Sequence, residues 1–453
     1  SIKPDFAEAL DYLGFLLRER GELQKSIDCY RKALAINPLS RDTHSSMLFA
    51  LQFDEKLTQE DLHAEHLRFA ESFEKPLASS RQIHANEKST ARRLKIGYVS
   101  PDFCRHSVAL FMLPVLLNHD KERFEVFCYY NNATGDDFTD QFVSAADQFV
   151  PCAEMSDDEL CERIRADGID ILIDLAGHTA HNRLLTFARK PAPVQMTYLG
   201  YPGTSGLSAI DYRLTDSFTN PEGSDRYYTE QLLRLPDSMW CYRPAENMQE
   251  VIPLPALGNG YLTFGSFNSI NKVGNDCIAL WADLLRTLPT SRLLMATVPE
   301  GEIRQRLSRQ FLEYGISSDR IRFIGTLPKY EFQQMLQQAD ISLDPFPVNG
   351  ATTTCESLWL GVPVLTLVGN RFLSRAGLSV LSAARLPEFA AATREAYLNT
   401  AAALASDLPR LANIRSTMRD HLMASPLLDV KRFTRNLEDI YRNAWITWCN
   451  TGE

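Results

Sequence analysis

Two stretches of the chain alternate short, almost continuous apolar runs with segments of helical periodicity. Such runs predict strands of parallel sheets, because strands buried on both faces carry apolar side chains at most positions. In the first stretch the expected strands are 94–100, 124–130, 170–175 and 194–200. In the second they are 262–267, 292–297, 322–325, 340–344 and 362–367. The pattern predicts an α/β protein with two lobes that face a cleft, where ligands of such sheets usually bind.

A proline-rich connector separates the predicted lobes. We expect an N-terminal lobe at 94–245, a connector at 246–260 and a C-terminal lobe at 261–453. The last helical stretch, 430–449, carries three aromatic residues that would pack it across a lobe. A polar segment at 77–93 reads as a linker to the region that precedes the first lobe.

Residues 1–76 are predicted to be helical. Residues 4–38 follow the pattern of a roughly 34-residue helix–turn–helix repeat, in which Gly21 allows the turn and Pro38 ends the second helix. The packing positions of this repeat are Ala9, Leu13, Gly14, Ile27, Tyr30 and Ala33. One repeat cannot bury both of its faces, so either further repeats precede Ser1 or this one packs directly on the next domain.

Composition narrows the function classes. The chain has 453 residues, 45% hydrophobic and 23% charged, which suggests about three globular domains. Its net charge of -10 argues against nonspecific binding to nucleic acid. No apolar run reaches the ~18 residues of a membrane span. Nine cysteines without a C-x-x-C pair are typical of a reducing compartment, so we expect a cytoplasmic protein that binds neither nucleic acid nor membrane.

Several common chemistries have no sequence signal here. Neither lobe opens its first helix with G-x-G-x-x-G, and no G-x-x-x-x-G-K-[ST] is present, which argues against dinucleotide oxidoreductases and P-loop enzymes. No cluster of histidine, cysteine and carboxylate residues has metal-ligand spacing. His178 and His181 lie three residues apart, but in a turn-like segment with no paired acid. We therefore expect no metal site.

The strongest candidate site is the run from Asp344 to Ser357. Here a buried strand leads into a Pro/Gly turn, and a helix then opens on three threonines. The free N–H groups of a helix N-terminus suit a diphosphate, and the Thr352 and Thr353 hydroxyls can add hydrogen bonds. Glu356, one turn into the helix, can accept hydrogen bonds from ribose hydroxyls. The alternative is a capped helix whose threonines serve only their own backbone.

Three further loops follow strands. Lys272 comes after the first strand of the second lobe, where an ammonium group can offset charge that grows on a departing diphosphate. His106 follows the first strand of the first lobe and can accept a proton or hold a sugar. The Gly200–Gly206 turn, which contains Pro202 and Gly203, exposes N–H groups that can approach a sugar. Each has an ordinary alternative: a surface lysine, a hydrogen-bonded loop histidine and a simple turn.

Taken together, these segments resemble the catalytic region of the protein O-GlcNAc transferase family. The resemblance is strongest to the SPINDLY-like branch and to bacterial-type, tetratricopeptide-containing glycosyltransferases. It covers about residues 94–449, and the helical repeat fits the tetratricopeptide arm of the family. The matching runs are Ile96–Ser100 with Asp102, Phe103 and His106; Gly177–Ala180; Pro191–Gln195; Leu199–Gly206; Phe267 and Asn268 with Lys272; and Asn349–Gly361.

The resemblance implies a fold and a set of roles. The fold is of the GT-B type, with two Rossmann-like lobes, and the sugar is transferred with inversion and without a metal or other cofactor. Lys272 is similar to the lysine that contacts the diphosphate, and His106 to a histidine proposed as the general base. Contacts to the nucleotide sugar are implied for Asn268, Leu327, Lys329, Phe332, Thr352, Thr353, Glu356, Pro202 and Gly203.

The sequence departs from the family pattern at three points, and the first two bear on the identity of the donor. Phe332 and Ala351 stand where animal O-GlcNAc transferases have histidines, and the short connector has no counterpart of the large domain inserted in those enzymes. An aromatic ring can still stack on a base but cannot donate a hydrogen bond from a ring nitrogen. The preferred function is transfer of GlcNAc from UDP-GlcNAc to Ser or Thr hydroxyls of proteins. The alternatives are protein O-fucosylation from GDP-fucose, and a catalytically dead scaffold whose repeat binds a partner.

Overall fold

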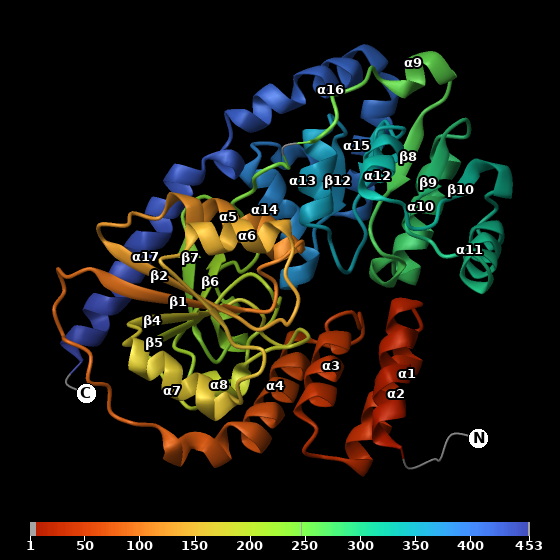
Figure 1. Ribbon diagram of the computed structural model, residues 1–453. Helices are drawn as coiled ribbons and strands as arrows, with labels where there is room; N and C mark the ends of the chain where they lie inside the picture. The colour runs from red at the N-terminus through yellow and green to blue at the C-terminus, as the bar shows by residue number, and fades with distance from the viewer. Residues whose placement is uncertain (1–5, 246, 452–453) are drawn as a thin grey trace. The chain divides into compact units, whose positions relative to one another are not determined.

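The computed structural model describes residues 6–245 and 247–451, which form two compact units around two parallel sheets (Figure 1). The first unit comprises Ser1–Phe15, Gln24–Arg243 and Asp429–Glu453, and the second comprises Leu16–Leu23 and Pro244–Leu428. Residues 1–5 of the predicted helical region, residue 246 of the predicted connector and residues 452–453 of the predicted second lobe lie outside the described residues.

The sheet of the first unit has parallel strands in the order β3-β2-β1-β4-β5-β6-β7. The strands are β1 (Leu94–Ser100), β2 (Phe124–Tyr130), β3 (Gln148–Pro151), β4 (Ile171–Asp174), β5 (Val194–Thr197), β6 (Tyr212–Asp216) and β7 (Gln231–Leu235). β1 is central, and its Ile96 pairs with Val126 of β2 and with Ile171 of β4. The strand order reverses between β1 and β4, and ligands of such sheets bind beyond the carboxyl ends of the strands at this point.

Helices cover this sheet, and the C-terminal helix is one of them. They are α5 (Ser107–Asn118), α6 (Asp137–Ala145), α7 (Asp157–Asp167), α8 (Leu184–Ala188), η2 (Ser224–Tyr227) and α17 (Val430–Asn450). α17 packs against α5, β5 and β7, and buries Tyr441 and Trp445 completely. Its Glu438 carboxylate accepts a hydrogen bond from His119 Nδ1 at 2.9 Å. The first unit is therefore completed by residues from the far end of the chain.

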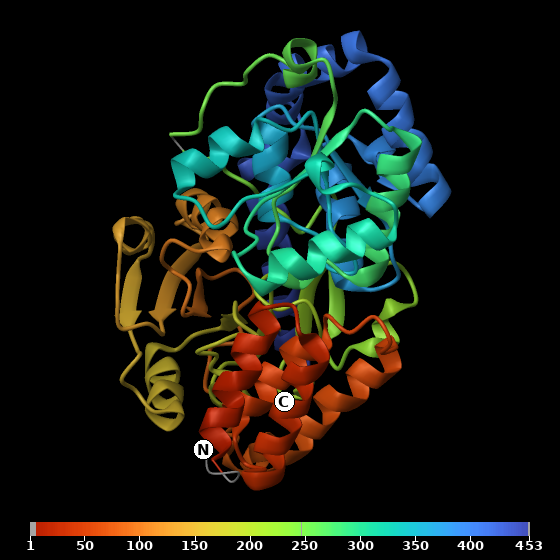
Figure 2. The same cartoon turned by 90° about the vertical axis from the view of Figure 1, so that its right-hand side faces the viewer.

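The N-terminal helices lie side by side, in red and orange in Figure 2. They are α1 (Ala7–Glu19), α2 (Leu23–Ile36), α3 (Arg41–Leu51), α4 (Gln59–Phe73) and η1 (Lys75–Ser80). A Cβ on Gly14 would lie 2.7 Å from the ring of Tyr30, so α1 and α2 pack here as closely as glycine allows. Ser26 Oγ donates to the Gly14 carbonyl at 2.6 Å, which fixes the same contact.

Buried histidines and aromatic rings attach α3 and α4 to the loops after β4 and β5. His66 Nε2 bonds the Tyr201 hydroxyl at 2.7 Å, and His178 Nδ1 bonds Ser45 Oγ at 3.0 Å. The His66 and His178 rings meet edge to face, 5.2 Å between centroids. Gly206 has φ +78°, and a Cβ there would lie 2.5 Å from the His66 carbonyl oxygen. The Gly200–Gly206 turn therefore packs directly against α4.

The sheet of the second unit is also parallel, in the order β10-β9-β8-β11-β12-β13. The strands are β8 (Thr263–Ser266), β9 (Arg292–Met295), β10 (Ile321–Phe323), β11 (Ile341–Leu343), β12 (Val364–Leu367) and β13 (Ala390–Ala391). The central strand β11 is buried at every position. Parallel strands buried on both faces explain the continuous apolar runs of the sequence.

Helices cover both faces of this second sheet. They are α9 (Pro255–Asn259), η3 (Ile270–Lys272), α10 (Asn275–Thr287), α11 (Glu302–Glu313), η4 (Ser318–Arg320), α12 (Lys329–Leu336), α13 (Thr352–Trp359), η5 (Phe372–Ser374), α14 (Ala376–Ala383), η6 (Pro387–Phe389), α15 (Arg394–Ser406), α16 (Leu408–Met423) and η7 (Pro426–Leu428). Buried Arg415 of α16 donates to the carbonyls of Ile252, Gln337 and Ala339, which ties the connector to the unit. No helix within 6–245 or 247–451 combines the length and apolar character needed to cross a membrane.

All the strands expected from the sequence are present, and four more join them. The four that the apolar pattern missed are β3, β6, β7 and β13. β3 and β13 are short edge strands, and β3 is largely exposed. β6 is buried but carries the polar residues Arg213, Thr215 and Asp216. These side chains can be buried because they form hydrogen bonds to nearby loops. A buried strand of this kind has no apolar signature.

The buried histidines predict a loss of stability in mild acid. Burial lowers the pKa of His66 to about 4 in the folded state, whereas in the unfolded chain this side chain has its ordinary pKa of 6.5. Between these two pH values the unfolded chain binds a proton at His66 and the folded protein does not. The contribution of His66 to stability is thus complete above about pH 6.5 and falls as the pH drops toward 4, by about 3 kcal/mol. The measurement is urea unfolding across this pH range.

His66→Gln is the test variant, and His63→Gln on the same helix is its control. The first should reduce the fall in unfolding free energy between about pH 6.5 and about pH 4, because burial also lowers the pKa of His44, His84 and His178. The second should leave the fall as it is in the wild type. Equal pH dependence in the wild type and in His66→Gln would contradict this account.

Candidate active site

The loops that follow β8 and β11 meet at the carboxyl edge of the second sheet. The two strands are neighbours, with Gly265 of β8 paired to Ser342 of β11. Beyond the strands, Val273 and Pro347 form an isolated bridge between the two loops. The loop that carries Lys272 and the turn that opens α13 therefore form one continuous surface.

Lys272 lies on this surface with its ammonium group between neutral oxygens. Nζ donates to Asn268 Oδ1 at 3.2 Å and to the Asn349 carbonyl at 3.4 Å. Burial lowers the pKa of Lys272, and the nearby charge of Asp344 raises it in part. Within the described residues, no carboxylate forms an ion pair with Lys272. An ammonium group in this setting keeps its charge available for an anionic ligand.

The N-terminus of α13 presents free donors beside Lys272. Ala351 is the N-cap residue and gives the helix no side-chain hydrogen bond. The Thr354 hydroxyl donates to the Gly350 carbonyl at 3.0 Å. For Thr352 and Thr353, no side-chain hydrogen bond is recorded within the described part of the chain. The alternative in which the threonines serve only their own helix thus holds for Thr354, and the other two hydroxyls remain available.

Asp344 lies beneath the turn and organises it. Its Oδ1 accepts the Gly350 N–H at 2.7 Å, and its Oδ2 accepts the Thr366 hydroxyl at 2.8 Å. Burial raises the pKa of Asp344 to about 7, although these hydrogen bonds and the charge of Lys272 lower it. A Cβ on Gly377, at the start of α14, would lie 2.5 Å from Asp344 Oδ2. Glycine at this position allows α14 to close on the carboxylate.

Glu356 and Lys329 form a second group of predicted residues in the same unit. Burial raises the pKa of Glu356, and the charge of Lys329 lowers it in part. The two side chains are therefore electrostatic neighbours, one from α13 and the other from the first turn of α12. A carboxylate and an ammonium group placed in this way offer both an acceptor and a donor to a polar ligand.

Leu327 and Phe332 border the apolar core beside this group. Both are partly buried and pack on the cluster that contains Phe267, Met335 and Leu336. The Phe332 ring meets Phe267 edge to face, with centroids 6.2 Å apart. Because Phe267 precedes Asn268, this cluster adjoins the loop that leads to Lys272.

His106 belongs to the first unit and is the N-cap residue of α5. Its Nδ1 accepts the Val108 N–H at 3.3 Å and lies 3.5 Å from Asp102 Oδ2. These two contacts require opposite states of Nδ1, since the first needs a lone pair and the second needs a proton. When Nδ1 accepts from Val108, the proton of the neutral ring is on Nε2. When Nδ1 donates to Asp102, Nε2 is free to accept a proton.

Pro202 and Gly203, also predicted to contact the sugar, lie in the turn that packs against α4. A Cβ on Gly203 would lie 3.0 Å from Gln52 Nε2, and Pro202 is buried. Buried Arg213 donates to the carbonyls of Gly203 and Tyr201, both at 2.7 Å. The shape of this turn is thus accounted for by packing within the first unit, and its contact with a sugar stays a prediction.

No sequence motif marks the residues that support the turn from other elements. Thr366 lies one residue before the end of β12 and Gly377 is the second residue of α14, and neither belongs to a motif. Asn349 also matters, because its Oδ1 accepts the Gly377 N–H at 3.3 Å while its carbonyl accepts from Lys272. Only the three-dimensional pairing of β11 with β12 brings these groups together.

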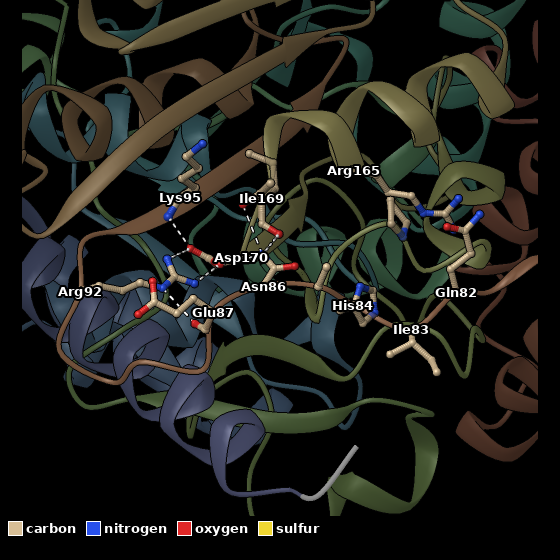
Figure 3. Close-up of a pocket in the computed structure, with 13 residues that line it drawn as sticks. Gln82, Ile83, His84, Asn86, Glu87, Arg92, Lys95, Arg165, Ile169 and Asp170 are labelled. Atoms are coloured by element: carbon tan, nitrogen blue, oxygen red, sulfur yellow. Dashed lines mark hydrogen bonds and ion pairs between the residues drawn. The ribbon is translucent and has the colours of Figure 1, made fainter.

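A separate pocket of about 430 Å³ lies at the opposite, amino edge of the first sheet (Figure 3). Arg92 and Asn86 point toward Asp170 and donate to its carboxylate, the amide at 2.8 Å. These contacts fasten the linker to the start of β4, so the pocket is distinct from the strand-end site. In the described residues, no group of three or more histidine, cysteine, aspartate or glutamate side chains is arranged to hold a metal ion.

Comparison with known proteins identifies the family. The model of glycosyl transferase family 41 matches residues 22–252 and 254–437. A tomato protein described as a probable UDP-N-acetylglucosamine–peptide N-acetylglucosaminyltransferase SPINDLY is 37% identical over 92% of this chain and 45% of its own length. The corresponding SEC protein of Arabidopsis thaliana is 32% identical over 79% of this chain and 38% of its own length. The chain thus spans less than half the length of these curated relatives.

Solved structures agree with this result. A mutant O-GlcNAc transferase from Thermobaculum terrenum superposes with a TM-score of 0.94 at 34% identity, over 100% of this chain and 86% of that one. A glycosyltransferase from Rickettsia africae, at 10% identity and a TM-score of 0.50 over 78% of this chain and 98% of its own, shares the fold alone. The predicted fold class, two Rossmann-like lobes of the GT-B type preceded by helices, is confirmed. The resemblance inferred from the motifs is confirmed as well, and the chain belongs to glycosyl transferase family 41.

Proposed function

We propose that this chain is an inverting, metal-independent protein O-glycosyltransferase that moves GlcNAc from UDP-GlcNAc to Ser or Thr hydroxyls of proteins. The observation that carries the proposal is the convergence of Lys272 and the free N-terminus of α13 on one surface. The names of the relatives, which specify UDP-N-acetylglucosamine and peptide, support the donor and the acceptor class.

In the proposed reaction, the acceptor oxygen bonds to C1 of the sugar while the bond from C1 to the diphosphate oxygen breaks. Negative charge grows on the departing UDP. Lys272, the N–H groups at the start of α13 and the hydroxyls of Thr352 and Thr353 are fixed donors for this charge, and Asn268 holds the ammonium group in place. Hydrogen bonds that become stronger in the transition state raise the rate. In known enzymes each such donor raises the rate by a factor of roughly 10²–10³.

The remaining proposed contacts concern the nucleoside and the proton. Glu356 accepts from ribose hydroxyls beside Lys329, while Leu327 and Phe332 border the base. We assign His106 to accept the proton of the attacking hydroxyl. For this step the ring donates from Nδ1 to Asp102 and gives up the hydrogen bond from Val108, so that Nε2 is free. Helices α1–α4 are proposed to help present the acceptor protein.

A cytoplasmic location is also proposed. It is supported by nine free cysteines, most of them buried, which behave as small apolar residues. Burial raises the pKa of the Cys128 thiol, and likewise that of Cys355, so neither is a reactive thiolate.

The activity is tested by mass spectrometry of a cell lysate incubated with the protein and UDP-GlcNAc. We expect HexNAc on Ser or Thr residues of the lysate proteins. Lys272→Ala should lower the turnover by about 100-fold or more, and should weaken UDP binding by less than about tenfold. Arg309→Ala, which removes an exposed positive charge from α11, is the control and should transfer normally. Full transfer by Lys272→Ala would refute the role of Lys272, and no labelling with any sugar nucleotide would favour a scaffold.

Thermal shift with UDP and with GDP tests the donor. UDP at about 100 times its Kd should stabilise the protein by about 2.7 kcal/mol and raise its Tm, because the ligand binds only the folded state. GDP at the same concentration should raise the Tm less. A shift with GDP alone would replace the proposed donor with GDP-fucose.

A further inference from the structure

Thr297 lies just after β9 in a conformation that threonine rarely adopts, and the reaction proposed above gives it no part. Its φ is +56°, in the left-handed region, where a side chain branched at Cβ is crowded by the backbone. Among the described residues other than glycine that have a positive φ, it alone is branched at Cβ. Such strain persists only where the surrounding structure imposes it, and it occurs often at functional sites.

Backbone hydrogen bonds on both sides of Thr297 impose this conformation. In the sheet, β9 lies between β8 and β10 (Figure 1). Before Thr297, the Ala296 N–H donates to the Ser266 carbonyl of β8 at 2.8 Å. After it, the Val298 N–H donates to the Ile324 carbonyl, just beyond β10, at 2.9 Å. The chain therefore changes its partner strand at Thr297, which fixes the backbone of this one residue.

The Thr297 side chain lies against the loop that carries Lys272. Its hydroxyl donates to the Asn268 carbonyl at 2.9 Å. Asn268 is 7% exposed, and its Oδ1 accepts from Lys272 Nζ at 3.2 Å. A Cβ on Gly350, in the turn before α13, would lie 2.9 Å from the same oxygen, so the Asn268 side chain also packs on that turn. A bond that fixes the Asn268 backbone thus fixes the side chain that contacts both parts of the proposed diphosphate site.

We infer that Thr297 is a positioning residue for Lys272 and that it acts through Asn268. The Thr297 hydroxyl holds the Asn268 carbonyl, and the Asn268 side chain holds the ammonium group where the departing diphosphate needs it. Glycine would adopt the same φ without strain, but it has no hydroxyl to donate. The inference rests on the proposed function, because it requires a diphosphate beside Lys272. A displacement of about 1 Å at a reacting group can lower a rate by about 100-fold, so even a partial shift of Lys272 is measurable.

Thr297→Val is the main variant, because valine keeps the size and branching of threonine and removes only the donor. Transfer of labelled GlcNAc from UDP-GlcNAc to the proteins of a fixed amount of cell lysate gives an apparent kcat and KM. We expect kcat to fall about tenfold or more and the KM for UDP-GlcNAc to change less than about threefold, since the lysine acts mainly in the transition state. Thr297→Ser retains the hydroxyl and should keep kcat within about twofold of the wild type.

A double variant tests whether Thr297 acts through Lys272. If it does, adding Thr297→Val to Lys272→Ala should change turnover by less than about twofold, because the group that is positioned is already gone. Independent effects would instead multiply and lower turnover by about tenfold more.

Thr287→Val is the matched control. Thr287 is the last residue of α10, and its exposed hydroxyl donates to the Asp283 carbonyl at 3.0 Å. Since α10 ends just before β9 begins, Thr287 lies at the amino edge of the sheet, away from the strand-end site. This variant loses the same kind of hydrogen bond and should keep the kcat of the wild type.

Thr297→Gly serves if Thr297→Val does not fold, because glycine removes the hydroxyl and the strain together. It should show the same fall in kcat. Wild-type kcat in Thr297→Val or Thr297→Gly would overturn the inference and leave the proposed function intact, because a purely structural threonine would alter only the Tm. A loss in Thr297→Ser as large as that in Thr297→Val, or multiplied effects in the double variant, would overturn it too. No transfer by the wild type would overturn both the inference and the proposed function.

Discussion

One electrostatic arrangement organises the second unit: a partly buried ammonium group and a helix N-terminus are held together by a turn that rests on a buried carboxylate. Lys272 and α13 come from loops on neighbouring strands, and Asp344 fixes the turn between them through the Gly350 N–H. In a buried setting, charges interact strongly and an unpaired charge is costly, so each of these groups depends on the others. The close approach of α14 at Gly377 completes the support.

The first unit uses polar contacts for a different purpose. His66, His178 and Tyr201 are buried where α3 and α4 meet the loops after β4 and β5. Glu74, at the end of α4, adds hydrogen bonds from the backbone N–H groups of Ser208 and Ala209. The helical region is thereby hydrogen-bonded to these loops, as a helical arm that presents an acceptor would need.

The sequence was sufficient for features that depend on local pattern. Continuous apolar runs predicted the central strands, since parallel strands are buried on both faces, and the Asp344–Ser357 run predicted a helix that opens at a strand end. It was insufficient where distant elements meet: nothing near Thr366 or Gly377 indicates that both face Asp344. The Gly200–Gly206 turn is a second example. Gly206 is needed there because α4, which is distant in the sequence, packs closely against it.

In the proposed function, Lys272 and the start of α13 hold the diphosphate of the donor. A crystal structure of the chain with UDP tests it most directly. We expect phosphate oxygens within hydrogen-bond distance of Lys272 Nζ and of the Thr352 and Thr353 hydroxyls. A nucleotide bound elsewhere, or Nζ still directed only at Asn268 and the Asn349 carbonyl in the complex, would contradict it.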